Sequence, residues 1–188
     1  MLDAPPRKRK LFVGIDLDED ARARCAAVSQ GLRDTGFDAR YESPEKLHVT
    51  LAFLGYVEPA LGEEVYSELS AASAAAKPFA LVLDRLGAFP HERRPRVVYV
   101  GAREQGAPFR ELAQSVRRAY ARLDFEFKDD AVAHVTIARV KESKRPLPLL
   151  EFPTIRLAVE ALTLFESLPD PSRKTSRYEV KLVVPLCL

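Results

Sequence analysis

The chain has 188 residues, of which 47% are hydrophobic and 30% are charged, with a formal net charge of +2 at pH 7. This length suits one domain or two small lobes that share a core, and the composition is that of an ordinary globular protein. The only two cysteines, Cys25 and Cys187, provide neither a disulfide framework nor metal-ligand spacing, which favours a reducing, cytoplasmic location. Since no apolar run approaches the ~20 residues of a membrane span, no membrane association is expected.

The first half of the chain is expected to start with a flexible basic tail. Residues 1–9 hold two prolines and a cluster of Arg and Lys, and we treat residues 10–188 as a single domain with two lobes. The weakly basic balance permits binding of nucleic acid but does not require it. Apolar periodicity and helix-start signals then predict a strand over 10–16, a helix over 18–36, a short strand over 38–42, a strand over 46–55 and a helix over 58–76.

The second half resembles the first in its order of elements. The patterns predict strands over 79–89 and 96–102, a helix over 107–123, a short strand over 125–127, a strand over 134–140, an irregular stretch over 145–153, and strands over 156–167 and 174–185. Because strand, helix, short strand and strand recur in this order, we expect an α+β fold. It would have two pseudo-symmetric lobes, with antiparallel or mixed sheets around a central cleft and helices outside.

Two of the three histidines begin the same tripeptide, His-Val-Thr, at residues 48–50 and 134–136. With six threonines in the chain, chance rarely places Thr two residues after two of three histidines. On a strand, residues i and i+2 share a face, so His48 lies beside Thr50 and His134 beside Thr136. The same alternation sends Val49, Leu51 and Phe53 to the core face.

This pair of motifs has the residues of a reaction centre for phosphate chemistry. One imidazole can accept a proton near neutral pH while the other donates one, and the two hydroxyls can bind phosphate oxygens. The alternative is that both histidines are structural. A metal site is not expected, because Cys, Asp and Glu do not accompany the histidines at ligand spacing. The chain also has no glycine-rich phosphate loop.

Arginines near these motifs are further candidates for phosphate contacts. Arg139 lies five residues after His134, an odd offset that faces away from the histidine on an unbroken strand. A strand end or bulge would turn its guanidinium toward phosphate. The basic loop over 91–96 is interpreted as a solvated loop, with substrate contact as the alternative, and His91 as a surface residue.

These residues resemble the two-histidine (2H) phosphoesterase superfamily, which is defined by a pair of HxTx motifs. The nearer resemblance is to RNA 2′,3′-cyclic phosphodiesterases, historically called 2′-5′ RNA ligases, and it covers nearly the whole chain. The matching segments are an opening strand over 11–17, the first motif with its run-in over 40–55, a central strand over 95–101 and a late strand over 164–167. One departure is Ala133, where the family commonly has proline.

The resemblance implies a two-lobed α+β fold whose motifs line a central cleft. It also implies metal-free hydrolysis of an RNA terminal 2′,3′-cyclic phosphate to a 2′-phosphate. In that reaction His48 protonates the leaving 3′-oxygen and His134 activates water, an assignment that rests on the resemblance because the residues themselves are symmetric about it.

Candidate substrate-binding residues are Arg139 together with Tyr41 and Phe53, which lie in the segment that matches the first motif. The expected partner is RNA with a 2′,3′-cyclic phosphate end. No cofactor, no metal and no obligate protein partner are expected, and the chain is taken as a monomer. Two alternatives stay open: 2′-5′ ligation of tRNA half-molecules, and a module that binds an RNA end or nucleotide without turnover.

Overall fold

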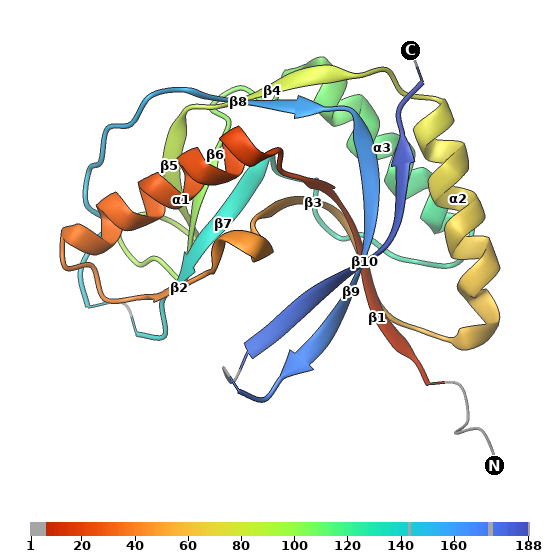
Figure 1. Ribbon diagram of the computed structural model, residues 1–188, viewed down its shortest axis with the longest axis horizontal. Coiled ribbons are helices and arrows are strands. Elements are labelled where there is room, and N and C mark those ends of the chain that lie inside the picture. Colours follow the sequence, from red (N-terminus) through yellow and green to blue (C-terminus); the bar gives the residue numbers. More distant parts are fainter. Residues whose placement is uncertain (1–6, 143, 173–174, 188) are drawn as a thin grey trace.

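The structure is a computed structural model, and it describes residues 7–142, 144–172 and 175–187. Figure 1 shows how the helices and strands of this part are arranged. In chain order they are β1 (Arg9–Asp16), α1 (Glu19–Asp34), β2 (Arg40–Tyr41), η1 (Pro44–Lys46), β3 (His48–Val57), η2 (Pro59–Leu61), α2 (Gly62–Ala74), β4 (Phe79–Leu83), β5 (Arg85–Phe89), β6 (Val97–Gly101), α3 (Gly106–Ala121), β7 (His134–Arg139), β8 (Ile155–Val159), β9 (Ala161–Asp170) and β10 (Thr175–Pro185).

The strands form two lobes that meet at the two His-Val-Thr strands (Figure 1). In the first lobe the strand order is β10-β9-β1-β3, and in the second it is β7-β6-β5, with β2 paired to β7. The lobes join through β3 and β7, which pair with Val49 opposite Val135. All pairings are antiparallel, and β4 and β8 form a separate small sheet. The predicted α+β fold with two lobes is confirmed.

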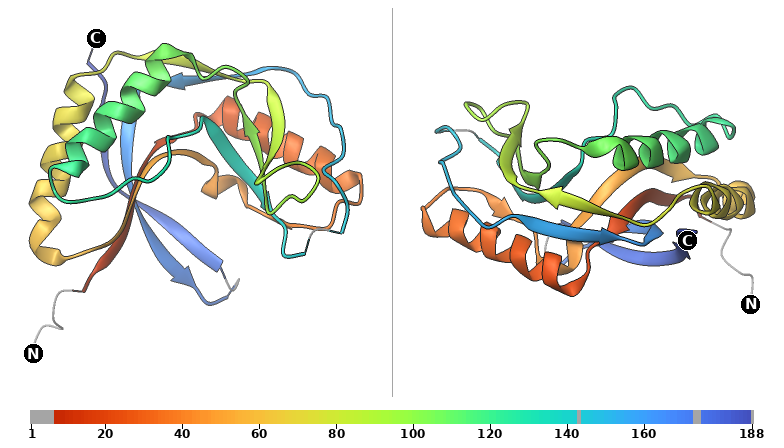
Figure 2. Two further views of the ribbon diagram at one scale, coloured as in Figure 1. Left: turned by 180° about the vertical axis from the view of Figure 1, so that it is seen from behind. Right: turned by 90° about the horizontal axis from the view of Figure 1, so that it is seen from above.

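The helices are exchanged between the halves of the chain. Helix α1, from the first half, packs against β7 and β8, whereas α3, from the second half, packs against β3 and α2. The two views in Figure 2 show α1 with the second lobe and α2 and α3 together beside the first. Asp18 starts α1 as its N-cap, where its side chain accepts a 2.7 Å hydrogen bond from the Ala21 N–H. No helix in the described residues is long and apolar enough to cross a bilayer.

Both His-Val-Thr strands contain a β-bulge at the same place. In β3, Thr50 pairs with Gly14 and Ala52 with Val13, so Leu51 is skipped in the ladder. In β7, Thr136 pairs with Tyr99 and Ala138 with Val98, so Ile137 is skipped. An extra residue on one strand reverses the alternation beyond it. The residues five positions after each histidine, Phe53 and Arg139, therefore point to the same side as the histidines.

Two predicted strands are each divided into two. Residues 79–89 form β4 and β5, which separate at Asp84 and belong to different sheets. The Asp84 carboxylate accepts a 2.9 Å hydrogen bond from the Arg103 N–H and so fixes this corner. Residues 156–167 likewise fall in β8 and β9, which separate at Glu160. The apolar pattern of the sequence does not show where the chain leaves one sheet for another, because the position of that break depends on the strands with which each segment pairs.

The short strand predicted over 125–127 is wrong. Asp124 has a φ of 62°, which turns the chain away after α3, and Phe125 and Phe127 pack against the core. Of the predicted tail, residues 1–6 lie outside the described residues, and β1 begins at Arg9. There the Arg9 guanidinium donates to Glu166 and Tyr66.

Candidate active site

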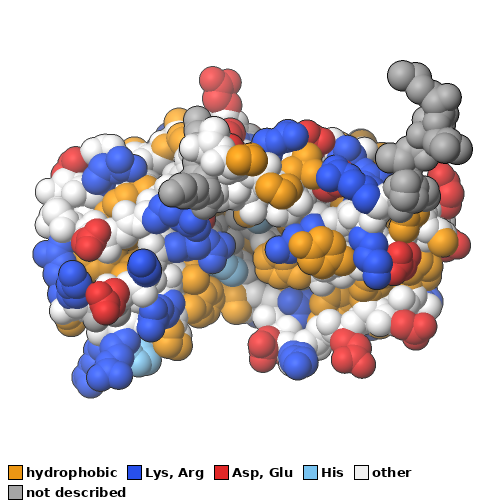
Figure 3. All heavy atoms as spheres, turned by 90° about the horizontal axis from the view of Figure 1, so that it is seen from below, with side chains coloured by type: hydrophobic (Ala, Val, Ile, Leu, Met, Phe, Trp, Pro, Cys, Tyr) orange, Lys and Arg blue, Asp and Glu red, His pale blue; other side chains and the backbone are white. Residues whose placement is uncertain are grey.

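A cleft of about 640 Å³ lies between the two lobes, and the two His-Val-Thr motifs line it from opposite sides. Figure 3 looks into this hollow, with Lys and Arg side chains gathered on the lobe at its left. Most of the described lining residues fall into three groups. They are the motif residues His48, Thr50, His134 and Thr136, the charged residues Lys10, Arg40, Glu42, Lys46 and Arg139, and aromatic residues that include Phe12, Phe53, Phe89 and Tyr178.

The ring of His48 is fixed by a backbone bond and by packing. Its Nδ1 lies 2.7 Å from the carbonyl oxygen of Lys46, and its Nε2 lies 3.0 Å from Thr50 Oγ1. Because a carbonyl can only accept, Nδ1 carries the hydrogen, and Nε2 faces the cleft as the reactive atom. Phe12 and Tyr178 pack on the imidazole with ring centroids 4.8 and 5.3 Å away.

A backbone carbonyl and aromatic packing also fix the ring of His134, on the opposite side of the cleft. Its Nδ1 lies 2.8 Å from the carbonyl oxygen of Val132, again two residues earlier in the chain. Phe89 and Tyr99 contact the imidazole edge to face, at 5.1 and 5.3 Å. Each histidine is thus locked in one tautomer and presents Nε2 to the shared cleft.

Burial lowers the pKa of both histidines. For His48, burial is the largest cause and brings the pKa to about 4. The Lys46 carbonyl and the charges of Asp16 and Glu42 act in the opposite direction, and the charge of His134 lowers the value further. For His134, burial again dominates, the Val132 carbonyl raises the pKa and Arg139 lowers it. Both rings are therefore neutral at pH 7 in the unliganded protein.

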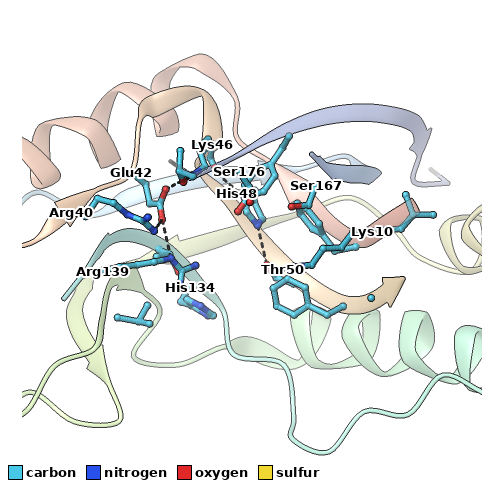
Figure 4. Close-up of a pocket in the computed structure, with 18 of the residues that line it drawn as sticks. Lys10, Arg40, Glu42, Lys46, His48, Thr50, His134, Arg139, Ser167 and Ser176 are labelled. Atoms are coloured by element: carbon cyan, nitrogen blue, oxygen red, sulfur yellow. Dashed lines mark hydrogen bonds and ion pairs between the residues drawn. The ribbon is translucent and has the colours of Figure 1, made fainter. Parts of the chain in front are cut away.

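Glu42 anchors the basic end of the cleft (Figure 4). Its side chain is only 8% exposed; Oε1 accepts from Arg139 Nε at 2.9 Å and Oε2 from Lys46 Nζ at 2.6 Å, while Arg40 approaches at 3.9 Å. Burial raises the pKa of Glu42, but the bonds to Lys46 and Arg139 outweigh it and hold the pKa below its usual value. The cations keep an excess positive charge beside the histidines, which suits a phosphate.

The described residues contain no group of three or more His, Cys, Asp and Glu side chains that is arranged to hold a metal ion. Glu42, the carboxylate in the described lining of the cleft, is already engaged by Lys46 and Arg139. An oxyanion is the ligand that this arrangement of cations, hydroxyls and imidazoles fits best.

Comparison with known proteins agrees with this geometry. A sequence model of the family described as LigT like Phosphoesterase matches residues 15–99 and 100–173. The chain belongs to this family. An RNA 2′,3′-cyclic phosphodiesterase of Archaeoglobus fulgidus is 35% identical over 134 residues, which cover 70% of this chain and 73% of that protein. Another of the same name, from Thermotoga maritima, is 27% identical over 167 residues, covering 87% and 89%.

Solved structures place this LigT-like phosphoesterase in the same fold. E. coli LigT complexed with 3′-AMP aligns with a TM-score of 0.77 at 25% identity, over 96% of this chain and 99% of that one. The crystal structure of a Thermus thermophilus protein aligns with a TM-score of 0.74 at 26% identity, over 94% and 97%. The agreement extends across both lobes and hence across the cleft between them.

The structure brings most of the predicted site residues of the LigT-like phosphoesterase together, but not all. Both histidines, both threonines and Arg139 line the cleft. Phe53 lines it too and is 67% exposed, so its placement on the core face by simple alternation is wrong, because of the bulge at Leu51. Tyr41 is not among the described lining residues: its hydroxyl donates to the Phe37 carbonyl at 2.8 Å, and Arg33 lies over its ring.

Sequence reasoning missed the residues that flank Tyr41. Arg40 and Glu42 alternate with it and so point into the cleft (Figure 4). A signal was present, since Glu42 and Lys46 are oppositely charged residues just before the first motif. Tyr178, from β10, carried no motif and could be found only from the pairing of β10 with β9.

Proposed function

We propose that this LigT-like phosphoesterase hydrolyses the terminal 2′,3′-cyclic phosphate of RNA to a 2′-phosphate without a metal cofactor. The observation that carries the proposal is the matched pair of histidines, each locked by a carbonyl two residues earlier and each directing Nε2 into one cleft. Relatives named RNA 2′,3′-cyclic phosphodiesterase, and an E. coli LigT complexed with 3′-AMP, support the substrate class.

In this mechanism His134 accepts a proton from water, whose oxygen attacks phosphorus while the bond from phosphorus to the 3′-oxygen breaks. His48 then gives its proton to that oxygen, which leaves as a hydroxyl. This direction follows the family resemblance, because burial lowers the pKa of both histidines and brings that of His48 to about 4 in the unliganded protein. Smaller effects differ between the two rings: Asp16 and Glu42 raise the pKa of His48, and Arg139 lowers that of His134. The bound phosphate anion raises the pKa of His48 and allows it to carry the proton.

The other lining residues bind the phosphate and the nucleoside. Thr50 and Thr136 stand beside the histidines and donate to the nonbridging oxygens as their charge grows. Arg139 uses Nε for Glu42, which leaves the two terminal nitrogens of its guanidinium for phosphate. Phe53, largely exposed on this face, offers a ring on which a base can stack.

Two variants test the roles of the histidines. In EDTA, the wild type is expected to convert an oligonucleotide 2′,3′-cyclic phosphate to the 2′-phosphate, and His48→Ala and His134→Ala are each expected to lower kcat by about 10²–10⁴-fold. A substrate with sulfur in place of the 3′-oxygen separates the roles, because a thiolate leaves without a proton. It should recover most of the loss in His48→Ala and none in His134→Ala.

Three outcomes would contradict the proposal. Full activity of His134→Ala would remove the assigned base, and sulfur rescue of His134→Ala alone would reverse the two roles. Activity lost in EDTA and restored by a divalent metal would overturn the metal-free reaction. A pure binding module would bind the oligonucleotide without forming product, but binding alone does not need two titratable groups held in matched tautomers.

A further inference from the structure

The cleft does not end at the two histidines. A second hollow of about 540 Å³ adjoins it, and the two share Thr50, Phe53, Phe89 and His134 among their described lining residues. His134 lines this second hollow, whereas His48 is not among its described lining residues. Its outer wall is the segment over 126–132, which runs directly into β7 and His134. We call it the side hollow, and it opens on the histidine assigned to activate the nucleophile.

The side hollow and the cleft carry opposite charge. The described lining of the cleft has four cations and one carboxylate. That of the side hollow has three carboxylates, Glu126, Asp129 and Asp130, against Arg117 and Lys128. All three carboxylates are on exposed residues.

Arg117 is held in place by structural contacts and keeps its positive charge, so Arg117 and Lys128 together offset two of the three carboxylates. Its Nε donates to the carbonyl oxygen of Leu51 at 2.9 Å, and its guanidinium also donates to the Asp129 carbonyl. The guanidinium carbon lies 5.4 Å from the centroid of the Phe127 ring. The described lining of the side hollow therefore carries one excess negative charge, whereas that of the cleft carries three excess positive charges, so an anion is disfavoured in the side hollow relative to the cleft.

We propose that the side hollow admits water to His134 and that its excess of carboxylates disfavours the entry of a second RNA strand, so that the enzyme hydrolyses the cyclic phosphate in preference to joining RNA ends. This inference rests on the proposed function, because it uses the same phosphate and the same assignment of the base. The charge of the side hollow then selects between two nucleophiles, water and a 5′-hydroxyl, at one reaction centre.

The competing reaction differs only in the nucleophile. In joining, the 5′-hydroxyl oxygen of a second RNA attacks phosphorus, its proton goes to His134, the bond to the 3′-oxygen breaks, and that oxygen takes the proton of His48. A 2′-5′ linkage results. The attacking oxygen must reach the His134 side of the phosphate, and the phosphates of its strand must then lie near Glu126, Asp129 and Asp130. Water has no net charge, unlike the phosphates of an RNA strand, so the carboxylates do not oppose its entry.

The test compares joining with hydrolysis in Glu126→Gln/Asp129→Asn/Asp130→Asn. One labelled RNA has a 2′,3′-cyclic phosphate end, and an excess of a second RNA has a 5′-hydroxyl; joined and hydrolysed products are counted on one gel. At 0.1 M salt we expect the ratio of joined to hydrolysed product to rise about tenfold over wild type. At 1 M salt, where the Debye length falls to ~3 Å, the difference should fall to less than about twofold.

Two controls separate this effect from a change in the reaction centre. Glu63→Gln/Glu64→Gln/Glu111→Gln removes the same charge from exposed residues on α2 and α3 that do not line the side hollow, and should leave the ratio at the wild-type value. An uncharged nucleoside as the 5′-hydroxyl acceptor should be joined equally by wild type and variant, because it has no phosphates to repel.

Each remaining outcome counts against one proposal or the other. An unchanged ratio, an equal rise in the control variant, or no joining by any protein that still hydrolyses the cyclic phosphate would overturn the role of the carboxylates. Failure of the wild type to hydrolyse the cyclic phosphate would instead overturn the proposed function.

Discussion

At the scale of single residues, the two histidines show how a strand can hold a reactive imidazole. Each ring is hydrogen-bonded to the carbonyl two residues before it, which needs only the local bend of the chain just before the strand. Ala133, directly before His134, is held by a long-range contact instead, since its backbone N–H donates to the Gln105 side chain. Proline, which the family commonly has at this position, lacks the N–H and could not make that bond, so Ala133 allows a contact that proline would not.

The buried histidines predict a pH dependence of stability. Their pKa values are lowered by folding, so the unfolded chain binds more protons than the folded one between about pH 6.5 and pH 4, and the folded state loses stability as pH falls through this range. Urea unfolding of the wild type at pH 7 and pH 5 should show this loss, and His48→Gln should show a smaller one. An equal loss in both proteins would contradict the lowered pKa of His48.

At the scale of elements, the matched bulges decide which side chains reach the cleft. Each bulge leaves a carbonyl outside the regular ladder, and each carbonyl has a partner. Leu51 O accepts from Arg117 Nε of α3, and Ile137 O accepts from the Glu42 N–H at 2.9 Å. The bulges are therefore supported from outside their own strands, which explains why Phe53 and Arg139 are held in place.

Close backbone approach beside the first bulge makes β1 sensitive to a single methyl group. A Cβ on Gly14 would lie 2.6 Å from the carbonyl oxygen of Val49, a backbone atom that cannot move without displacing β3. We expect Gly14→Ala to lower the free energy of unfolding by about 1–3 kcal/mol and to reduce kcat for cyclic phosphate hydrolysis.

Gly62→Ala is the matched control for this substitution. It adds the same methyl at the start of α2, where no described atom beyond its chain neighbours and its own helix backbone lies within 4 Å, and should be neutral or slightly stabilising. Urea denaturation and turnover of both variants measure the difference. Equal free energies of unfolding for the two variants would contradict this prediction, because β3 would then have moved to accommodate the methyl group.

The part of the site that follows local periodicity could be predicted, and the part that depends on neighbouring strands could not. Alternation placed each histidine beside its threonine. It failed at Phe53, because a bulge depends on the register of β1 against β3, and at residues 79–89, because Asp84 directs the chain to a second sheet. The role of Glu42 required knowing that β2 lies beside β7, which brings Arg139 within reach.

At the scale of the whole molecule, the exchanged helices make the two halves of the chain depend on each other. Without the second half, α1 would lose its contacts with β7 and β8; without the first, α3 would lose those with β3 and α2. The apolar faces of both helices would then be exposed to water.

We therefore expect the segments 1–102 and 103–188, produced separately, to lack a cooperative thermal transition, and the intact chain to unfold in one transition by circular dichroism and tyrosine fluorescence. Mixing the two segments should restore the transition, because the missing contacts lie between them. Cooperative unfolding of either segment alone would contradict this dependence.

The exchange of helices also bears on symmetry. Two identical half-chains related by a twofold axis could trade helices in the same way and bring two copies of one His-Val-Thr strand together. Such a dimer would have to present identical surroundings to both of its histidines. A single chain is free of that constraint: here Asp16 and Glu42 act on His48 and Arg139 on His134, and carboxylates line the approach to His134. Covalent linkage of the halves thus permits a directional reaction at a site whose backbone is nearly symmetric.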